Sequence, residues 1–189
     1  FITVWTGEFG VDAAVLGVVV AIGYALYGIG SVPGGLAVDT YGSKPVLIVC
    51  LLGMGGSFVL LGILDGILGV TIALVVWGTA ASIYHPAGLR LISTGISRRG
   101  RGFAYHGIAG NVGIAFGPLV AAVLLIGFDW RIVVGLMAAP ALLAAVYTAY
   151  VSVDETAAVS DDETLAIADG GWKSLREFFG DTRLLFTGG

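Results

Sequence analysis

Residues 102–128 read GFAYHGIAGNVGIAFGPLVAAVLLIGF, which is 27 residues without a single Asp, Glu, Lys or Arg. A helix of about 20 residues, rising ~1.5 Å per residue, crosses the ~30 Å hydrocarbon core of a bilayer. Four more runs share this property, at 13–38, 45–64, 66–89 and 132–153. The sequence therefore predicts an all-α, polytopic transmembrane helical bundle with spans at about 13–38, 45–64, 66–95, 102–128 and 130–153.

The composition of the 189 residues agrees with this prediction, since 57% are hydrophobic, 12% are charged and 31 are glycine. A soluble domain has about 25% charged residues and ~7% glycine. The same values exclude a disordered chain, and they exclude a nucleic-acid-binding domain. Cys50 is the only cysteine, which excludes a disulfide scaffold. With two His and no H-E-x-x-H pattern, we expect no catalytic residue, no metal and no cofactor.

Charge divides the chain into a membrane unit, residues 1–152, and an acidic tail, residues 153–189. Residues 1–153 carry six bases and five acids, whereas the remainder carries three bases and eight acids. Within the tail, Trp172, Leu175, Phe178 and Phe179 recur at helical spacing, which predicts a short amphipathic helix on the membrane face. Residues 184–186 begin an apolar stretch that we interpret as the start of a next span.

The loops of a membrane protein orient it through their Lys and Arg content, with the basic side in the cytoplasm. Arg131 is the only base in the loops of one side of the predicted bundle. The other side holds Lys44, Arg90, Arg98, Arg99 and Arg101. We therefore expect a multi-pass protein of the cell membrane whose loops 39–45 and 96–102, with the tail 153–189, are cytoplasmic.

This orientation places residues 1–12 outside the cell, yet the sequence begins at Phe1 without an initiator Met or a signal peptide. A missing upstream span is the simplest explanation. The five runs then become helices two to six of a six-helix unit.

Glycines of the run at 102–128 follow one helix face. His106, Gly110, Gly113 and Gly117 are spaced 4, 3 and 4 residues apart. Small residues at such spacing let a second helix approach closely, and Gly30-xxx-Gly34 repeats the device. The strip serves either the static packing of a rigid bundle or a surface on which two halves rock.

Prolines also interrupt the apolar runs, at positions 33, 86, 118 and 140. Proline removes a backbone hydrogen bond and bends a helix, so we expect bent spans. Such helices are typical of a protein that changes shape.

Polar groups within a membrane are costly, so each is a candidate for function. His85 shares a face with Gly78 and Ser82, and we expect His85 and His106 to face one inner vestibule. Histidine changes charge near neutral pH, which suits a proton or substrate site. The alternative for His85 is a neutral imidazole bonded to the backbone near Pro86.

Two further candidates for a substrate or proton site have structural alternatives. Asn111 either joins helices or touches substrate. Arg90 either extends to the lipid headgroups or belongs to the site.

Asp39 is predicted at the C-terminal end of the first span, where the helix dipole disfavours an anion. Its stabilising partner must therefore lie elsewhere. The options are Lys44 and the N-terminus of a helix outside this sequence, while the alternative is a solvated loop acid.

Residues 35–47 read GLAVDTYGSKPVL. The stretch resembles the signature between helices two and three of the major facilitator superfamily, roughly G-x-L-a-D-r-x-G-r-k-x-x-l. The anchors that match are Gly35, Asp39, Gly42, Lys44 and Leu47. Ala37, Thr40 and Ser43 depart from it.

A second resemblance lies in residues 113–118, GIAFGP, followed by Ala121-Ala122. It is similar to the G-x-x-x-G-P-x-x-G-G signature of proton-coupled drug antiporters, with Pro118 at the proline position. Together with Tyr84-His85-Pro86 and Gly110-Asn111, it resembles the fosmidomycin-resistance branch. Where many drug and proton exchangers carry an arginine, this chain has Val75.

The resemblance implies helices two to six of the amino-terminal half of a twelve-helix transporter. It would move a small organic solute by alternating access, coupled to protons and in the efflux direction, with Gly35, Asp39, Gly42 and Lys44 as a gating motif. Its implied partners are the lipid bilayer, the solute, protons and the second half of the same chain. The competing hypotheses are a membrane-embedded receptor or scaffold and a membrane-embedded enzyme.

Overall fold

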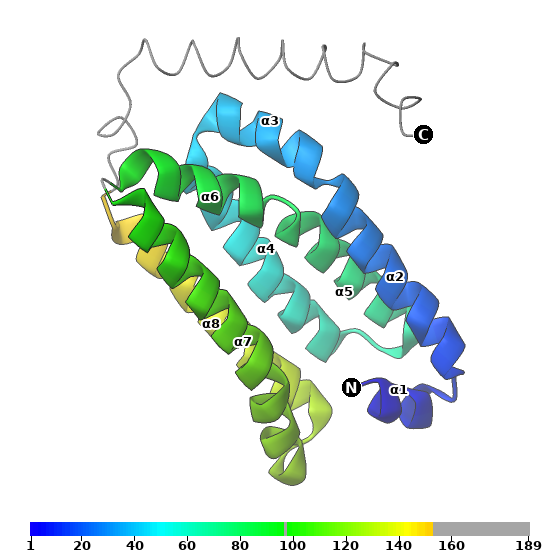
Figure 1. The fold of residues 1–189 in the computed structure, drawn as a ribbon. Coiled ribbons are helices and arrows are strands. Elements are labelled where there is room, and N and C mark those ends of the chain that lie inside the picture. The colour runs from blue at the N-terminus through cyan, green and yellow to red at the C-terminus, as the bar shows by residue number, and fades with distance from the viewer. Residues whose placement is uncertain (97, 153–189) are drawn as a thin grey trace, which may run out of the picture.

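The computed structural model describes residues 1–96 and 98–152, and within them every regular element is a helix (Figure 1). The predicted all-α fold is confirmed. The helices are α1 (Ile2–Phe9), α2 (Ala13–Ile29), α3 (Ser31–Tyr41), α4 (Ser43–Ile63), α5 (Gly66–Ala81), α6 (Tyr84–Gly95), α7 (Arg99–Gly127) and α8 (Trp130–Tyr150). The amphipathic helix and the next span predicted in 153–189 lie outside the described residues.

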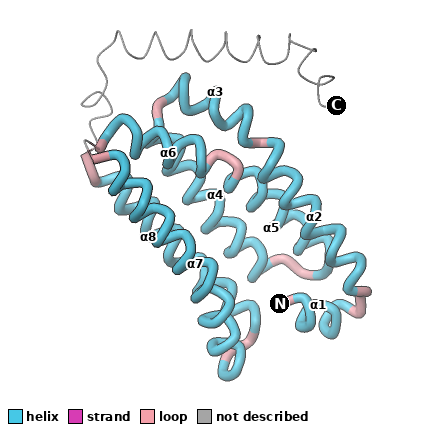
Figure 2. The backbone as a smooth tube through the Cα atoms, viewed as in Figure 1, coloured by secondary structure: helices cyan, strands magenta, loops and turns pink. Residues whose placement is uncertain are grey.

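Four helical segments of the described chain are long and apolar enough to cross a membrane. They are 43–63, 66–95, 99–127 and 130–150. The pair α2 and α3 passes the same test together and is bent by 43°, which makes a fifth candidate span. The short connections between the helices are visible in Figure 2.

Of the prolines at positions 33, 86, 118 and 140, two lie beside helix breaks. Pro33 is in the first turn of α3 and Pro86 in the first turn of α6, where backbone N–H groups lack a helical partner in any case. Pro118 and Pro140 instead lie inside α7 and α8, each of which continues as one helix. The sequence predicted bends at all four positions; the described chain has helix breaks at α2/α3 and α5/α6, beside Pro33 and Pro86.

Glycines bring α2 and α3 close to α5 and α6. A Cβ atom added at Gly78 would overlap the carbonyl oxygen of Gly23, and one added at Gly34 would lie 2.8 Å from Cγ2 of Ile83. A Cβ at Gly30 would overlap the Ser82 hydroxyl. Gly30 and Gly34 thus allow the close approach that their spacing predicts.

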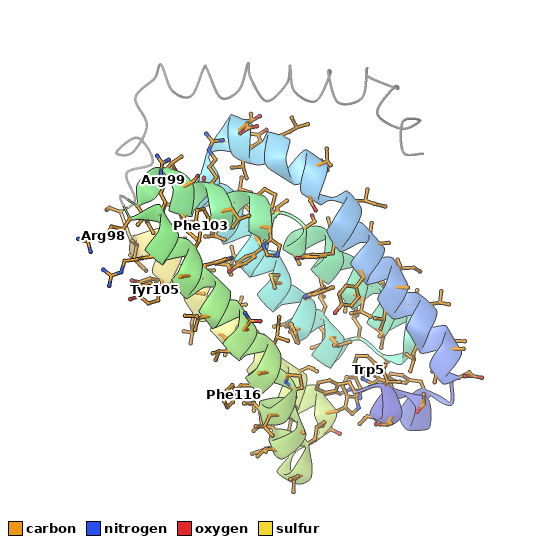
Figure 3. All side chains as sticks on the ribbon, viewed as in Figure 1. Trp5, Arg98, Arg99, Phe103, Tyr105 and Phe116 are labelled. Carbon is orange, nitrogen blue, oxygen red and sulfur yellow. The ribbon has the colours of Figure 1, made fainter. Side chains whose placement is uncertain are left out.

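The two ends of the bundle differ. One end holds α1, the α4–α5 connection and the start of α8, and the main buried cluster, which includes Trp5, Leu16 and Trp130, lies here. At the opposite end α3, α6 and the start of α7 lie together, around a smaller cluster of Val38, Val46 and Ala87 (Figure 1). The basic residues Arg98 and Arg99 are at this second end (Figure 3).

Candidate functional site

A row of aromatic rings, half-buried or exposed, links the four helices α2, α5, α6 and α7. Each ring contacts the next with centroids between 5.3 and 6.2 Å apart. Edge-to-face and offset pairs at such distances are mutually favourable. In order along the row the residues are Tyr24, Trp77, Tyr27, His85, Tyr84 and His106.

The row ends in two histidines on different helices. The rings of His85 on α6 and His106 on α7 meet edge to face with centroids 6.4 Å apart, and Tyr84 stacks on His106 at 5.8 Å. The structure therefore brings together the two histidines that the sequence placed near one end. The contacts of His85 here are with rings, Tyr27 among them, rather than with a backbone carbonyl near Pro86.

A cavity of about 240 Å³ opens at the other end of the row. Its lining comes from α1, α2, α4, α5 and α8, together with Phe1, and none of the lining side chains is charged. Tyr24 and Trp77 belong both to the lining and to the row. The other lining residues are Phe1, Trp5, Val20, Ser57, Phe58, Leu61, Ala73, Leu74 and Val134.

Asp39 is paired with Arg90. A guanidinium nitrogen of Arg90 on α6 lies 2.6 Å from Oδ1 of Asp39, in the last turn of α3. The sequence reasoning did not suggest Arg90 as this partner, and a contact of Asp39 with Lys44 or with a helix outside the sequence stays a prediction. Arg90 therefore binds a carboxylate of the bundle, and the pair joins α3 to α6, the helices that follow the breaks at α2/α3 and α5/α6.

Lys44 binds the end of another helix. Its Nζ donates to the carbonyl oxygens of Ala149 and Val151, at 3.0 and 2.8 Å. These carbonyls belong to the C-terminal end of α8, where the helix dipole favours a cation. The lysine therefore fastens the start of α4 to the end of α8.

The two motif glycines have different surroundings. Gly42 joins α3 to α4 with φ 83° and ψ 164°, a conformation that L side chains rarely adopt. A Cβ atom added at Gly35 would meet no atom within 4 Å. Gly42 is thus required by the turn itself, while the face around Gly35 is open.

The sequence matches the family model of the Major Facilitator Superfamily over residues 1–189. The chain belongs to the major facilitator superfamily. The superfamily assignment made from the 35–47 signature is therefore correct. Membership in a transporter family also agrees with the expectation that the chain is not an enzyme.

Relatives of this superfamily member are found in two strains of Mycobacterium tuberculosis. One is named a putative uncharacterized MFS-type transporter and the other an uncharacterized MFS-type transporter. Each is 36% identical to this chain over 132 residues, or 68% of this chain. The chain spans only 30% of the length of these relatives.

Two crystal structures of a mutant of the peptide transporter POT share the fold. The complex with sulfate has a TM-score of 0.67 at 18% identity, covering 98% of this chain and 40% of the other. The complex with alafosfalin has a TM-score of 0.65 at 21% identity, covering 97% and 41%. At such low identity the likeness establishes the major facilitator fold and no more.

The glycine strip of this major facilitator chain has no neighbour among the described residues. Cβ atoms added at Gly110, Gly113 and Gly117 would each meet nothing within 4 Å. Asn111 donates to the carbonyl of Gly107 on its own helix, and Pro118 lies inside the same helix. Figure 3 shows Phe103, Tyr105 and Phe116 on this helix, and all three side chains are exposed. Packing of a further helix on the strip stays a prediction.

One network was missed by the sequence reasoning. Arg131, at the start of α8, pairs with Glu8 of α1 and with Asp65 of the α4–α5 connection, and its guanidinium lies 4.3 Å from the Trp130 ring centroid. Trp130 Nε1 also donates to Glu8. The available signal was that Arg131 is the only base in the loops of its side, facing Glu8 and Asp65 there.

Proposed function

We propose that the chain forms part of a secondary active transporter that moves a small organic solute by alternating access, coupled to protons and in the efflux direction. Family membership supports the transport activity. The single observation that carries the proton coupling is the meeting of His85 and His106 between α6 and α7. Histidine is the side chain whose charge changes near neutral pH, and two neighbouring imidazoles repel each other once both are protonated.

The signature residues Gly35, Asp39, Gly42 and Lys44 form the gating element of this proposal. The Asp39–Arg90 pair and the bonds of Lys44 to α8 cross between helices, so movement of α3 or α4 would have to break or carry them. The open face at Gly35 leaves space for a helix of the second half. Because Asp39 and Arg90 are both accessible, they remain available to exchange partners between states.

The sidedness follows from the charge. The α3–α4 and α6–α7 connections lie at one end of the bundle (Figure 1), with Lys44, Arg98 and Arg99 around them. By the positive-inside rule we place this end, loops 39–45 and 96–102, and the tail 153–189 in the cytoplasm of a cell-membrane protein. Cysteine accessibility from each side of intact cells tests this placement.

We place the protein in the fosmidomycin-resistance branch, on the strength of Tyr84-His85-Pro86 and the Gly110-to-Pro118 segment. The test is growth of a sensitive strain expressing the complete protein on fosmidomycin and on a panel of small organic compounds. Increased resistance that disappears when the proton gradient is collapsed is the expected result. Unchanged sensitivity to fosmidomycin would remove the protein from this branch.

A further inference from the structure

We propose that the breaks of two spans form one shared hinge, at which Gly30 and Ser82 meet and about which α3 and α6 turn together relative to α2 and α5. The proposal deepens the proposed function and rests on it only in assigning this movement to alternating access. The movement itself can be measured without any solute, so the two proposals can fail separately.

The two breaks lie side by side (Figure 1). A Cβ atom added at Gly30, between α2 and α3, would overlap the hydroxyl of Ser82 and lie 2.6 Å from its Cβ atom. Ser82 directly follows α5, and α6 begins two residues later. Because glycine places no side chain between them, the two breaks share one point of contact.

Each break has fewer backbone hydrogen bonds than a continuous helix. Pro33 and Pro86 have no N–H, so each leaves the carbonyl four residues before it without its helical bond. Serine hydroxyls donate to carbonyls of the preceding turn at both breaks, Ser31 at 2.8 Å and Ser82 at 2.7 Å. Proline, adjacent Gly and Ser, and such hydroxyl bonds are recurrent causes of helix bending, and α2 and α3 are bent by 43°. A change of direction here therefore breaks few further backbone bonds.

Beyond the breaks, α3 and α6 are joined along their length. Next to the hinge, Gly34 lets α3 approach the start of α6 closely. Val38 and Ala87 then share one buried cluster. The ion pair between Asp39 and Arg90 lies farthest from the breaks. These contacts hold α3 and α6 as one unit, the α3–α6 unit.

Before the breaks, α2 and α5 form a second tight unit. A Cβ atom added at Gly78 would overlap the carbonyl oxygen of Gly23, and one added at Gly23 would lie 3.1 Å from the carbonyl oxygen of Leu74. Closely packed backbones have little space in which to deform and transmit movement instead. Relative movement of the two units is therefore concentrated at the breaks between them.

The hinge connects two parts of the proposed mechanism. His85 is on α6, and its ring contacts that of Tyr27 on α2 with centroids 6.2 Å apart, so this contact crosses the hinge. Asp39 is on α3. A turn of the α3–α6 unit therefore moves His85 and Asp39 at the same time, and it alters the surroundings of His85.

The test measures three distances between pairs of spin labels by double electron–electron resonance, with the full-length protein in lipid nanodiscs and in a background free of other cysteines. One pair, at Val18 and Thr40, crosses the α2/α3 break. A second pair, at Leu68 and Leu89, crosses the α5/α6 break. The third pair, at Thr40 and Leu89, lies within the α3–α6 unit. All four side chains are exposed.

The hinge predicts different distributions for these distances. A turn of about 10° would move Thr40, which lies about 15 Å along the helix from Gly30, by about 3 Å. We expect broad or two-peaked distributions for the two pairs that cross a break. We expect a single narrow distribution for Thr40 and Leu89, because the unit turns as a whole.

Gly30→Ala places a methyl group against Ser82 at the point of contact. We expect it to shift both distances that cross a break and to slow transport. Adding Ser82→Gly removes the obstructing atoms and should restore both. Gly28→Ala is the matched control on α2, because its Cβ atom would meet nothing within 4 Å. Thermal unfolding establishes that each variant is folded.

Three results would overturn the proposal. One is that the distributions across the breaks are as narrow as the one within the unit. Another is that the distribution within the unit is as broad as those across the breaks, because α3 and α6 would then move separately. The third is folded Gly30→Ala protein with wild-type distances. Movement at the hinge in a protein that transports nothing would support this inference and refute the proposed function, whereas transport without such movement would refute this inference alone.

Discussion

The ion pair between Asp39 and Arg90 links α3 to α6, which are the helices that follow the breaks at α2/α3 and α5/α6. The side chains are 73% and 38% exposed, respectively, and an exposed ion pair contributes at most about 1 kcal/mol to stability. Asp39→Asn should therefore barely change thermal unfolding, yet reduce transport by the full-length protein, because the gating that we propose requires this contact to change between conformational states. Thr40→Ala, one residue away, is the control. Wild-type transport rates for Asp39→Asn in proteoliposomes would count against a gating role.

His85 carries the predicted response to pH. His85→Ala removes one of two imidazoles that meet at 6.4 Å, so we expect transport to lose its pH dependence between about pH 5 and 8. Uptake measured at a series of pH values tests this, with Tyr105→Ala on the exposed side of α7 as the control. A pH profile identical to that of wild type would return His85 to a structural role.

Arg131 is expected to matter for stability. Replacing it with Ala breaks the pairs with Glu8 and Asp65 and the contact with Trp130, so we expect a loss of about 1–3 kcal/mol in the free energy of unfolding. Arg131→Lys keeps the positive charge but cannot bind both carboxylates as a guanidinium does. Its free energy of unfolding should lie between those of wild type and Arg131→Ala. Thermal unfolding followed by circular dichroism measures the effect. Equal stability of wild type and Arg131→Ala would show that this network is dispensable.

Residue pairings were the part of the site that sequence reasoning predicted least well. Asp39 and Arg90 are 51 positions apart, so nothing local to the 35–47 signature indicates their contact. Arg131 and Glu8 are farther apart still. The chemistry of these residues was evident from their type, but their partners depend on how separate helices pack.

At the scale of helices, some glycines lie in tight helix–helix contacts and others lie on open helix faces. Gly78→Ala would drive a Cβ into the backbone of α2, whereas Gly110→Ala meets nothing within 4 Å. We expect Gly78→Ala to destabilise the bundle by about 2 kcal/mol or more, and Gly110→Ala to be neutral or to stabilise it by up to about 1 kcal/mol. Unfolding of both variants in detergent gives the comparison. Similar behaviour of the two would contradict the helix packing described here.

The existence of the spanning helices was predictable because each span is a long run without charged residues, which is unfavourable in water. The positions of the helix breaks were less predictable. The run 13–38 reads as one span, but the chain divides at Gly30, where α3 starts with Pro33 in its first turn. Pro118 and Pro140 carry the same local signal inside unbroken helices. Packing against neighbouring helices, rather than proline alone, decides where a span is interrupted.

For the whole molecule, α7 is the least covered span. Ala121 is the one buried residue of this helix, and the glycine strip at 110–117 is open. A bulky residue there, as in Gly113→Leu, should leave the unfolding of residues 1–189 unchanged. In the full-length protein it should impair transport if a second-half helix packs on the strip. Full activity of that variant would show that no such packing is needed.

The proposed proton coupling is tested most directly by following solute and protons together. The full-length protein is reconstituted in proteoliposomes containing a pH-sensitive dye, and a gradient of a transported solute is imposed without a membrane potential. The account predicts proton movement opposite to the solute flux in wild type, and loss of that movement in His85→Ala. Solute flux without any change in lumenal pH would contradict it.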